Sequence, residues 1–138
     1  MNPPAGLYLD TSAVLRSILE SGTTPEIEQS IQDASLLITS RLSLVESARA
    51  ITRLRATGAV GESALADATH ELHALWARCD IWELTPNVCD LAGRVAPHRP
   101  LSSLDALHLA TFVLARQRLP DLMLLSTDQR LVEAARGT

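Results

Sequence analysis

The sequence predicts an α/β fold, a three-layer sandwich in which helices cover both faces of a parallel sheet of about four strands. Short apolar runs alternate along the chain with stretches whose apolar residues recur at helical spacing, which is typical of strand–helix–strand units. With 138 residues, of which 46% are hydrophobic and 20% charged, the chain is long enough to bury a core. We expect a single domain over residues 1–138.

Four short apolar runs are expected to be strands: Gly6–Leu9, Leu36–Thr39, Ile81–Leu84 and Leu122–Ser126. The segments between them carry helix-starting Ser, Thr or Pro and helix-ending Gly or Pro. The expected helices are Ser12 to about Gly22, Pro25–Ala34, Ser43–Thr57, Glu62–Cys79, Pro86–Val95, Leu104–Leu119 and a short one from Asp128.

Two of these helices are expected to form a protruding hairpin. In the first, Ser43–Thr57, the apolar residues Leu44, Ala48 and Ile51 share one stripe, and Gly58 ends the helix. In the second, Glu62–Cys79, a longer apolar face can pack against that stripe. Its members are Leu65, Ala68, Leu72, Leu75 and Trp76.

Composition excludes several classes of protein. All 12 basic residues are arginine, so mechanisms that need a lysine, such as a P-loop or a Schiff base, are excluded. A net charge of −4 argues against a general nucleic-acid coat protein, and 3% aromatic residues are too few for base-stacking platforms. The N-terminus does not resemble a leader and no apolar run approaches a membrane span, so we expect a soluble, cytoplasmic protein.

Four acidic residues fall where a strand gives way to a helix or where a helix begins: Asp10, Glu46, Asp105 and Asp128. A parallel sheet with right-handed crossovers brings the carboxyl ends of its strands to one edge, where ligands of open α/β sheets bind. We therefore expect the four carboxylates to meet there. Oxygen ligands of this kind favour a hard divalent cation.

Each acid also has a purely structural interpretation. Asp10 and Asp128 can be helix N-caps, although Ser12 can cap the first helix and leave the Asp10 carboxylate free. Glu46 lies opposite the Leu44 stripe and can be a solvated residue paired with Arg49.

Asp105 begins a helix that is apolar around its whole circumference and is therefore expected to be buried. A carboxylate there needs a partner, and a cation is the economical one. His108, one turn later, can either contact the site or be a satisfied core histidine.

The motifs together resemble the PIN-domain ribonucleases, in particular the VapC toxins of bacterial toxin–antitoxin pairs. The resemblance rests on the segments Leu7–Val14 and Leu104–Thr111 and the pair Thr127–Asp128. Glu46, within Ser43–Ala48, stands where that family has its glutamate. The order Asp, Glu, Asp, Asp is kept, and the match spans the whole chain.

The resemblance implies an endoribonuclease that needs Mg²⁺ or Mn²⁺ and leaves a 3′-hydroxyl and a 5′-phosphate. It implies a homodimer that a cognate VapB-like antitoxin inactivates, and the helical hairpin is expected to contribute to the dimer or to the antitoxin groove. Inhibition is expected to involve an antitoxin arginine that pairs with the site carboxylates.

In the family's pattern, Asp10 and Asp105 would hold the principal metal, and Glu46 and Asp128 would complete the pocket or help a second metal. Thr11, Ser12 and Thr127 would orient carboxylates or waters. Many members carry an arginine three residues before the third acid, where this chain has Ser102. Arg99 is a candidate to replace that arginine in contacting phosphate.

Other classes fit less well. A haloacid-dehalogenase-type phosphatase needs a second aspartate where Ser12 stands, and a receiver domain needs a lysine and an acidic pair before Asp10. The remaining alternative is a PIN-like module that binds RNA or protein without catalysis. The presence of all four acids argues against it.

Overall fold

A computed structural model describes residues 6–138, and its centre is a parallel sheet of four strands in the order β3-β2-β1-β4. The strands are β1 (Leu7–Leu9), β2 (Leu37–Ser40), β3 (Cys79–Trp82) and β4 (Met123–Leu125). Tyr8 of β1 pairs with Ile38 of β2 on one side and with Leu124 of β4 on the other. The predicted strands are confirmed, although β3 begins two residues early because the preceding helix leads into it without a loop.

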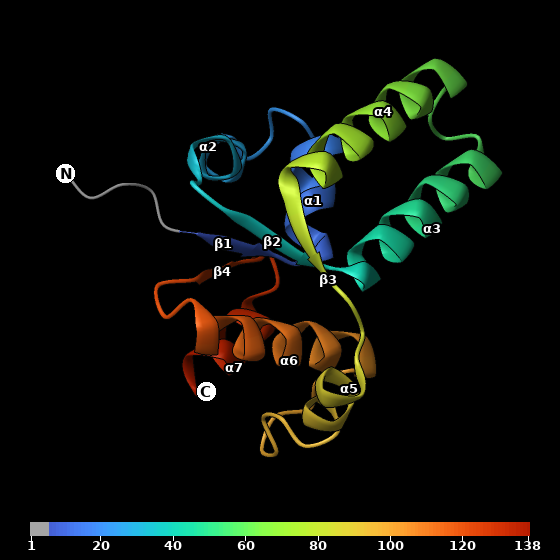
Figure 1. Cartoon of the computed structure of the whole chain (residues 1–138). Coiled ribbons are helices and arrows are strands. Elements are labelled where there is room, and N and C mark those ends of the chain that lie inside the picture. The colour runs from blue at the N-terminus through green and yellow to red at the C-terminus, as the bar shows by residue number, and fades with distance from the viewer. Residues whose placement is uncertain (1–5) are drawn as a thin grey trace.

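Helices cover both faces of this sheet (Figure 1). On one face lie α1 (Thr11–Ile18), α2 (Pro25–Asp33), α3 (Arg41–Thr57) and α4 (Glu62–Arg78), and on the other α5 (Pro86–Ala92), α6 (Ser103–Arg118) and α7 (Gln129–Arg136). The predicted three-layer α/β architecture is therefore confirmed. Within residues 6–138, none of the helices combines the length and apolar character that crossing a membrane would take.

The two layers have separate cores because neighbouring strand residues point to opposite faces. Tyr8 belongs to the core beneath α6 and α7, together with Leu109, Phe112 and Leu131. Leu9, the next residue, belongs to the core beneath α1 to α4. Both side chains are fully buried, so β1 contributes to both cores.

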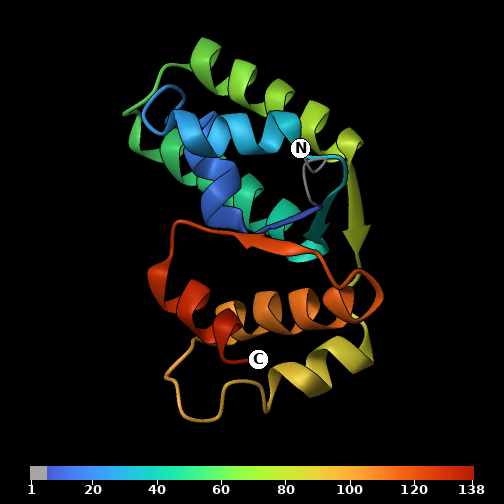
Figure 2. The ribbon, with the colours of Figure 1, turned by 90° about the vertical axis from the view of Figure 1, so that its left-hand side faces the viewer.

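The strand order places a switch point at the carboxyl end of β1. The chain moves from β1 outward to β2 and β3, and then returns to place β4 on the other side of β1. The helix after β1 packs on one face of the sheet and the helix after β4 on the other, as the edge-on view shows (Figure 2). A crevice is expected where two such neighbouring strands end, and ligands of open α/β sheets bind there.

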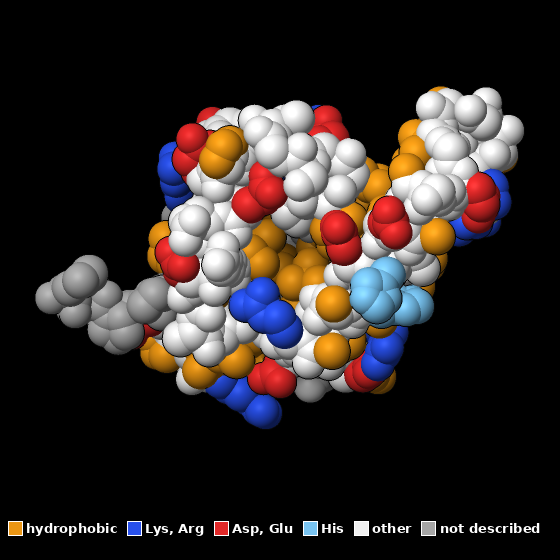
Figure 3. Space-filling model, turned by 90° about the horizontal axis from the view of Figure 1, so that it is seen from above, with side chains coloured by type: hydrophobic (Ala, Val, Ile, Leu, Met, Phe, Trp, Pro, Cys, Tyr) orange, Lys and Arg blue, Asp and Glu red, His pale blue; other side chains and the backbone are white. Residues whose placement is uncertain are grey.

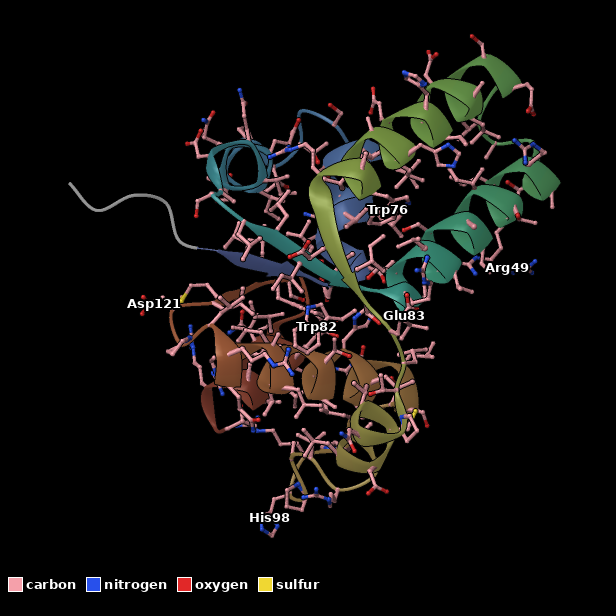
Figure 4. The ribbon with its side chains drawn as sticks, in the orientation of Figure 1. Arg49, Trp76, Trp82, Glu83, His98 and Asp121 are labelled. Atoms are coloured by element: carbon pink, nitrogen blue, oxygen red, sulfur yellow. The ribbon has the colours of Figure 1, made fainter. Side chains whose placement is uncertain are left out.

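The predicted hairpin forms from α3 and α4, which project beyond the sheet (Figure 1). Gly58, in the left-handed conformation with φ of 67°, ends α3 as expected. The predicted α4 face is confirmed, since Leu65, Ala68, Leu72 and Leu75 are buried. Between the two helices lies a cavity of about 430 Å³, and Trp76 is part of its lining (Figure 4).

The predicted stripe of α3 faces α4, as expected for a hairpin, but it is only partly buried. Only Ile51 of that stripe is buried, while Leu44 and Ala48 line the partly open cavity toward α4. The face that packs against the domain carries Leu42, Ser43, Ser47, Ala50 and Ile51. Small serines fit close to α1, and an apolar pattern does not detect them. The helix also starts earlier than predicted, with Ser40 as its N-cap instead of Ser43.

Candidate active site at the carboxyl edge of the sheet

Asp10 lies at the end of β1, with only 4% of its surface exposed. Its Oδ1 accepts hydrogen bonds from the backbone N–H of Ala13 at 3.0 Å and from the Ser12 hydroxyl at 2.7 Å. Asp10 is therefore the N-cap of α1. The expectation that Ser12 caps this helix is wrong, because the Ser12 hydroxyl donates to the Asp10 carboxylate and thereby orients it.

The second carboxylate oxygen of Asp10 is bound by a residue that follows the neighbouring strand β4. Ser126, just after β4, donates to Oδ2 at 2.6 Å. Burial raises the pKa of Asp10, although the hydrogen bonds from Ser126, Ser12 and Ala13 work in the opposite direction. All three donors are neutral, so the structure holds a buried carboxylate in a fixed orientation without a direct cationic partner.

Ser126 also connects Asp10 to Asp128. Its hydroxyl accepts from the backbone N–H of Asp128 at 2.9 Å. Asp128 is the N-cap of α7, since its Oδ1 accepts from the N–H of Arg130, and its side chain is 28% exposed. Thr127 reaches the same network through its backbone N–H, which donates to the Ser12 hydroxyl at 3.0 Å.

Glu46 lies on α3, and its carboxylate faces α1 and α6 instead of solvent. Oε1 accepts from the Thr11 hydroxyl at 2.6 Å and lies 2.8 Å from His108 Nε2. The interpretation of Glu46 as a solvated residue beside Arg49 is therefore wrong. Glu46 lies opposite the Leu44 stripe, as expected, but that side of α3 faces α1 and α6.

The pKa of Glu46 is shifted in the opposite direction to that of Asp10. Burial pushes it upward, but hydrogen bonds from His108 and Thr11 and attraction to His108 and Arg53 outweigh burial and lower it. Glu46 is therefore held as a carboxylate, with both of its hydrogen bonds on Oε1.

Asp105 lies in the first turn of α6 and is half-buried. The expectation that this end of the helix is buried on all sides is wrong, because the neighbouring Leu104 is 47% exposed. The start of α6 extends past the edge of the sheet, while the later turns are covered. From residues 6–138 the Asp105 carboxylate receives no hydrogen bond or ion pair, so its oxygens are available to a ligand.

Hydrogen bonds connect three of the four predicted acids to one another's neighbourhood, whereas Asp105 is related to them only through its position on α6. Asp10 and Asp128 share Ser126, and Glu46 is held by Thr11, the neighbour of Asp10. Asp105 is one turn before His108, which contacts Glu46. Among the described residues, no three His, Cys, Asp or Glu side chains are close enough to form a ready metal centre. Like charges explain the spacing, since each inner carboxylate is turned toward hydroxyl or imidazole donors.

The donor set nevertheless fits a hard divalent cation. The candidate ligands are all oxygen atoms, and Mg²⁺ and Mn²⁺ take carboxylates and waters in preference to nitrogen or sulfur. A buried carboxylate with only neutral donors, as at Asp10, gains most from a nearby cation.

Arg99, one of the predicted supporting residues, has another partner, and two residues that hydrogen-bond within the site's network, Ser126 to Asp10 and Tyr8 to His108, were not predicted. Arg99 forms an ion pair with Glu133 of α7 at 3.6 Å, and no site carboxylate accepts from it. Ser126 and Tyr8 were not identified as site residues. A serine after a strand has no distinctive signal, and Tyr8 looked like an ordinary core residue.

Comparison with known proteins gives a consistent result. The PIN domain family model matches residues 7–137. Ribonuclease VapC35 of Mycobacterium tuberculosis is 34% identical over 131 residues, which cover 94% of this chain and 89% of the relative. Ribonuclease VapC45 of the same species is 30% identical over 126 residues, or 91% and 85% of the two chains.

Two solved structures share the fold. PAE2754 from Pyrobaculum aerophilum superposes with a TM-score of 0.69 at 21% identity, covering 98% of this chain and 83% of that one. VapBC2 from Rickettsia felis, bound to a DNA fragment from its promoter, has a TM-score of 0.59 at 13% identity, with coverage of 89% and 99%.

Proposed function

Because the chain belongs to the PIN-domain family, as a member of the VapC type, we propose that it is a metal-dependent endoribonuclease. In this proposal it is a cytoplasmic toxin that cuts RNA phosphodiesters and is neutralised by a cognate antitoxin. The observation that carries the proposal is Asp10, a buried carboxylate oriented by three neutral donors at the switch point of the sheet. Its nearest network also contains Asp128.

A bound Mg²⁺ or Mn²⁺ would supply Lewis acidity, which makes water a better nucleophile and offsets charge on the phosphate. Asp10 and Asp105 are the proposed ligands of the principal ion, one rigidly held and the other without a hydrogen bond or ion pair from the described part of the chain. Glu46 and Asp128 complete the pocket or help a second ion. Ser12 and Ser126 hold the Asp10 carboxylate in place, and Thr11 does the same for Glu46.

The remaining supporting residues have smaller roles in this proposal. Thr127 contributes its backbone N–H to the Ser12 hydroxyl, so its side chain is dispensable. Arg99 is exposed on the loop before α6, where it can approach an RNA phosphate if its pair with Glu133 opens.

The test is cleavage of RNA by the purified protein with Mg²⁺, with Mn²⁺ and with excess chelator. Cleavage should require metal, and sequencing of the new ends should show 5′-phosphates and identify the preferred RNA. Asp105→Asn should abolish cleavage and leave the fold intact. Undiminished cleavage in chelator would contradict the metal mechanism, and absence of cleavage under all conditions would favour a binding module instead.

The antitoxin is proposed to occupy the hollow between α2 and α4, which has an apolar floor when seen from above (Figure 3). This hollow of about 300 Å³ includes Ile18, Ile31 and Leu75, and its charged lining residues are Glu28, Glu71 and Arg78. An apolar segment with basic residues fits such a surface, and an arginine from it can pair bidentately with the site carboxylates.

A pair of substitutions tests this partner. Glu71→Arg should weaken neutralisation by a co-expressed antitoxin without slowing RNA cleavage, because it reverses a charge in the hollow. Asp90→Arg on α5, on the opposite face of the sheet, should change neither. Equal neutralisation of both variants would place the antitoxin elsewhere.

The homodimer is proposed to use the α3–α4 hairpin. Leu44 and Trp76, which line the cavity between these helices, are partly exposed, and a second copy could bury them. Light scattering should give twice the chain mass, and Trp76→Ala should shift the equilibrium toward the monomer. A monomer at all concentrations, with and without antitoxin, would refute this assignment.

A further inference from the structure

A chain of buried side chains runs from β1 through α6 to Glu46. The Tyr8 hydroxyl lies 2.9 Å from His108 Nδ1, and His108 Nε2 lies 2.8 Å from Glu46 Oε1. Tyr8 is fully buried and His108 is 3% exposed. Phe112 packs edge-on against Tyr8, with ring centroids 5.9 Å apart, and fixes the phenol ring at the start of the chain.

The Glu46 carboxylate, at one end of this chain of hydrogen bonds, indicates their direction. Glu46 is a carboxylate and can only accept, so His108 Nε2 must carry the hydrogen that lies between them. In the tautomer with its hydrogen on Nε2, the ring accepts from the Tyr8 hydroxyl at Nδ1. In that tautomer Tyr8 donates to His108 and His108 donates to Glu46.

Thr11, at the start of α1, is the second residue that holds the Glu46 carboxylate. Its hydroxyl donates to the same Oε1 at 2.6 Å and lies 3.2 Å from His108 Nε2. Two donors on Oε1 fix the plane of the Glu46 carboxylate, so Oε2 has a defined direction. On a helix near the protein surface, a glutamate without such partners would sample several rotamers.

We infer that Tyr8 and His108 are positioning residues of the nuclease site, which hold Glu46 by Oε1 and leave Oε2 to a metal that would bind there. This inference rests on the proposed function, and it assigns to two buried residues a role in addition to core packing. Neither residue needs to touch RNA or metal. Partners of this kind commonly contribute ten- to hundredfold to metal affinity.

The test measures Mn²⁺ affinity by calorimetry together with thermal stability. His108→Leu removes the donor to Glu46 at similar volume and should weaken Mn²⁺ binding about tenfold to hundredfold. His108→Gln, whose amide N–H can reach toward Oε1, should recover most of that loss. Tyr8→Phe keeps the ring and removes only the hydroxyl, so it should fold and give a smaller loss in the same direction.

Leu109→Ala is the matched control, because Leu109 is fully buried on the same helix and belongs to the core cluster of Tyr8. It should lower the melting temperature and leave Mn²⁺ affinity unchanged. If His108→Leu also lowers only the melting temperature, His108 is a core residue and the inference is wrong.

A second readout needs no metal. The ring-nitrogen NMR shifts of His108 in metal-free protein should show the hydrogen on Nε2. A ring with hydrogen on Nδ1 alone would overturn the inference. Failure of the inference is distinct from failure of the proposed function, because wild type that binds Mn²⁺ and cuts RNA upholds the function whatever His108 does. Wild type that does neither overturns both.

Discussion

Asp10 and Glu46 follow neighbouring strands of one sheet, yet the protein treats their carboxylates differently. Asp10 is almost fully buried among neutral donors, and burial raises its pKa. Glu46 is half-buried with His108 and Thr11 on one oxygen, and its pKa is lowered despite burial. The fold therefore favours the charged form of Glu46 and disfavours the charged form of Asp10. Asp10 is the better candidate for the centre of a cation site, because a cation would offset the cost of burying its charge.

The largest expected effect comes from Asp10→Asn. This change should reduce RNA cleavage by about a hundredfold or more, since a metal ligand contributes several kcal/mol to the transition state. It should also raise the melting temperature in chelator at neutral pH, because asparagine can cap α1 and no charge is then buried. Calorimetric melting and a cleavage assay check both parts. A less stable variant would show that Asp10 is a structural cap.

Glu46→Gln should give the opposite stability result. It loses charge-assisted hydrogen bonds with His108 and Thr11, so the free energy of unfolding should fall by about 1 kcal/mol at neutral pH. Cleavage should fall as well. Urea unfolding measures the first and single-turnover kinetics the second. Stability equal to that of wild type would mean that the bonds on Oε1 contribute nothing.

The two carboxylates should also respond oppositely to pH. A raised folded pKa means that stability from Asp10 is fully present below its unfolded pKa of about 3.9 and is lost as pH rises through the folded value. A lowered folded pKa means that stability from Glu46 is present above about 4.3 and is lost as pH falls through the folded value.

The stability gain of Asp10→Asn should therefore shrink on acidification, and so should the loss of Glu46→Gln. Urea titrations at several acidic pH values measure both differences. If the stability gain of Asp10→Asn stays constant across that range, burial does not disfavour the charged form of Asp10, and this part of the account is wrong.

The smallest expected effects come from the two residues after β4. Ser126→Ala removes the donor to Asp10 Oδ2 and should weaken Mn²⁺ binding about tenfold. Thr127→Val should leave binding unchanged, since Thr127 acts through its backbone N–H. Calorimetric titration of both variants makes the comparison. A larger loss for Thr127→Val than for Ser126→Ala would reverse the assigned roles.

Sequence reasoning predicted the sheet, the hairpin and the positions of Asp10 and Asp128 after their strands, because parallel topology leaves little choice for the ends of strands. It could not predict how each acid is held. The donor to Asp10 from β4 is 116 positions away at Ser126, and a serine after a strand looks like any turn residue.

The overlooked second face of α3 has a similar physical cause. Ser43 and Ser47 are fully buried, so a pattern that counts only apolar residues missed the face that packs against the domain and left Glu46 looking solvated. For Asp105 the error was the reverse. An apolar sequence suggested burial, but the first turn of α6 extends past the sheet and leaves Leu104 exposed. The spacing of apolar residues shows which sides of a helix are apolar. It does not show which turns are covered, because that depends on the neighbouring elements in the fold.

The most direct test of the central claim, that the carboxylates at this edge form a divalent-cation site centred on Asp10, is calorimetric titration of Mn²⁺ into wild type and Asp10→Asn. We predict saturable binding to wild type and little or none to the variant, while the variant stays folded and melts at an equal or higher temperature in chelator. Equal binding to both proteins would contradict the account and would place the metal, if it has a role, elsewhere on the molecule.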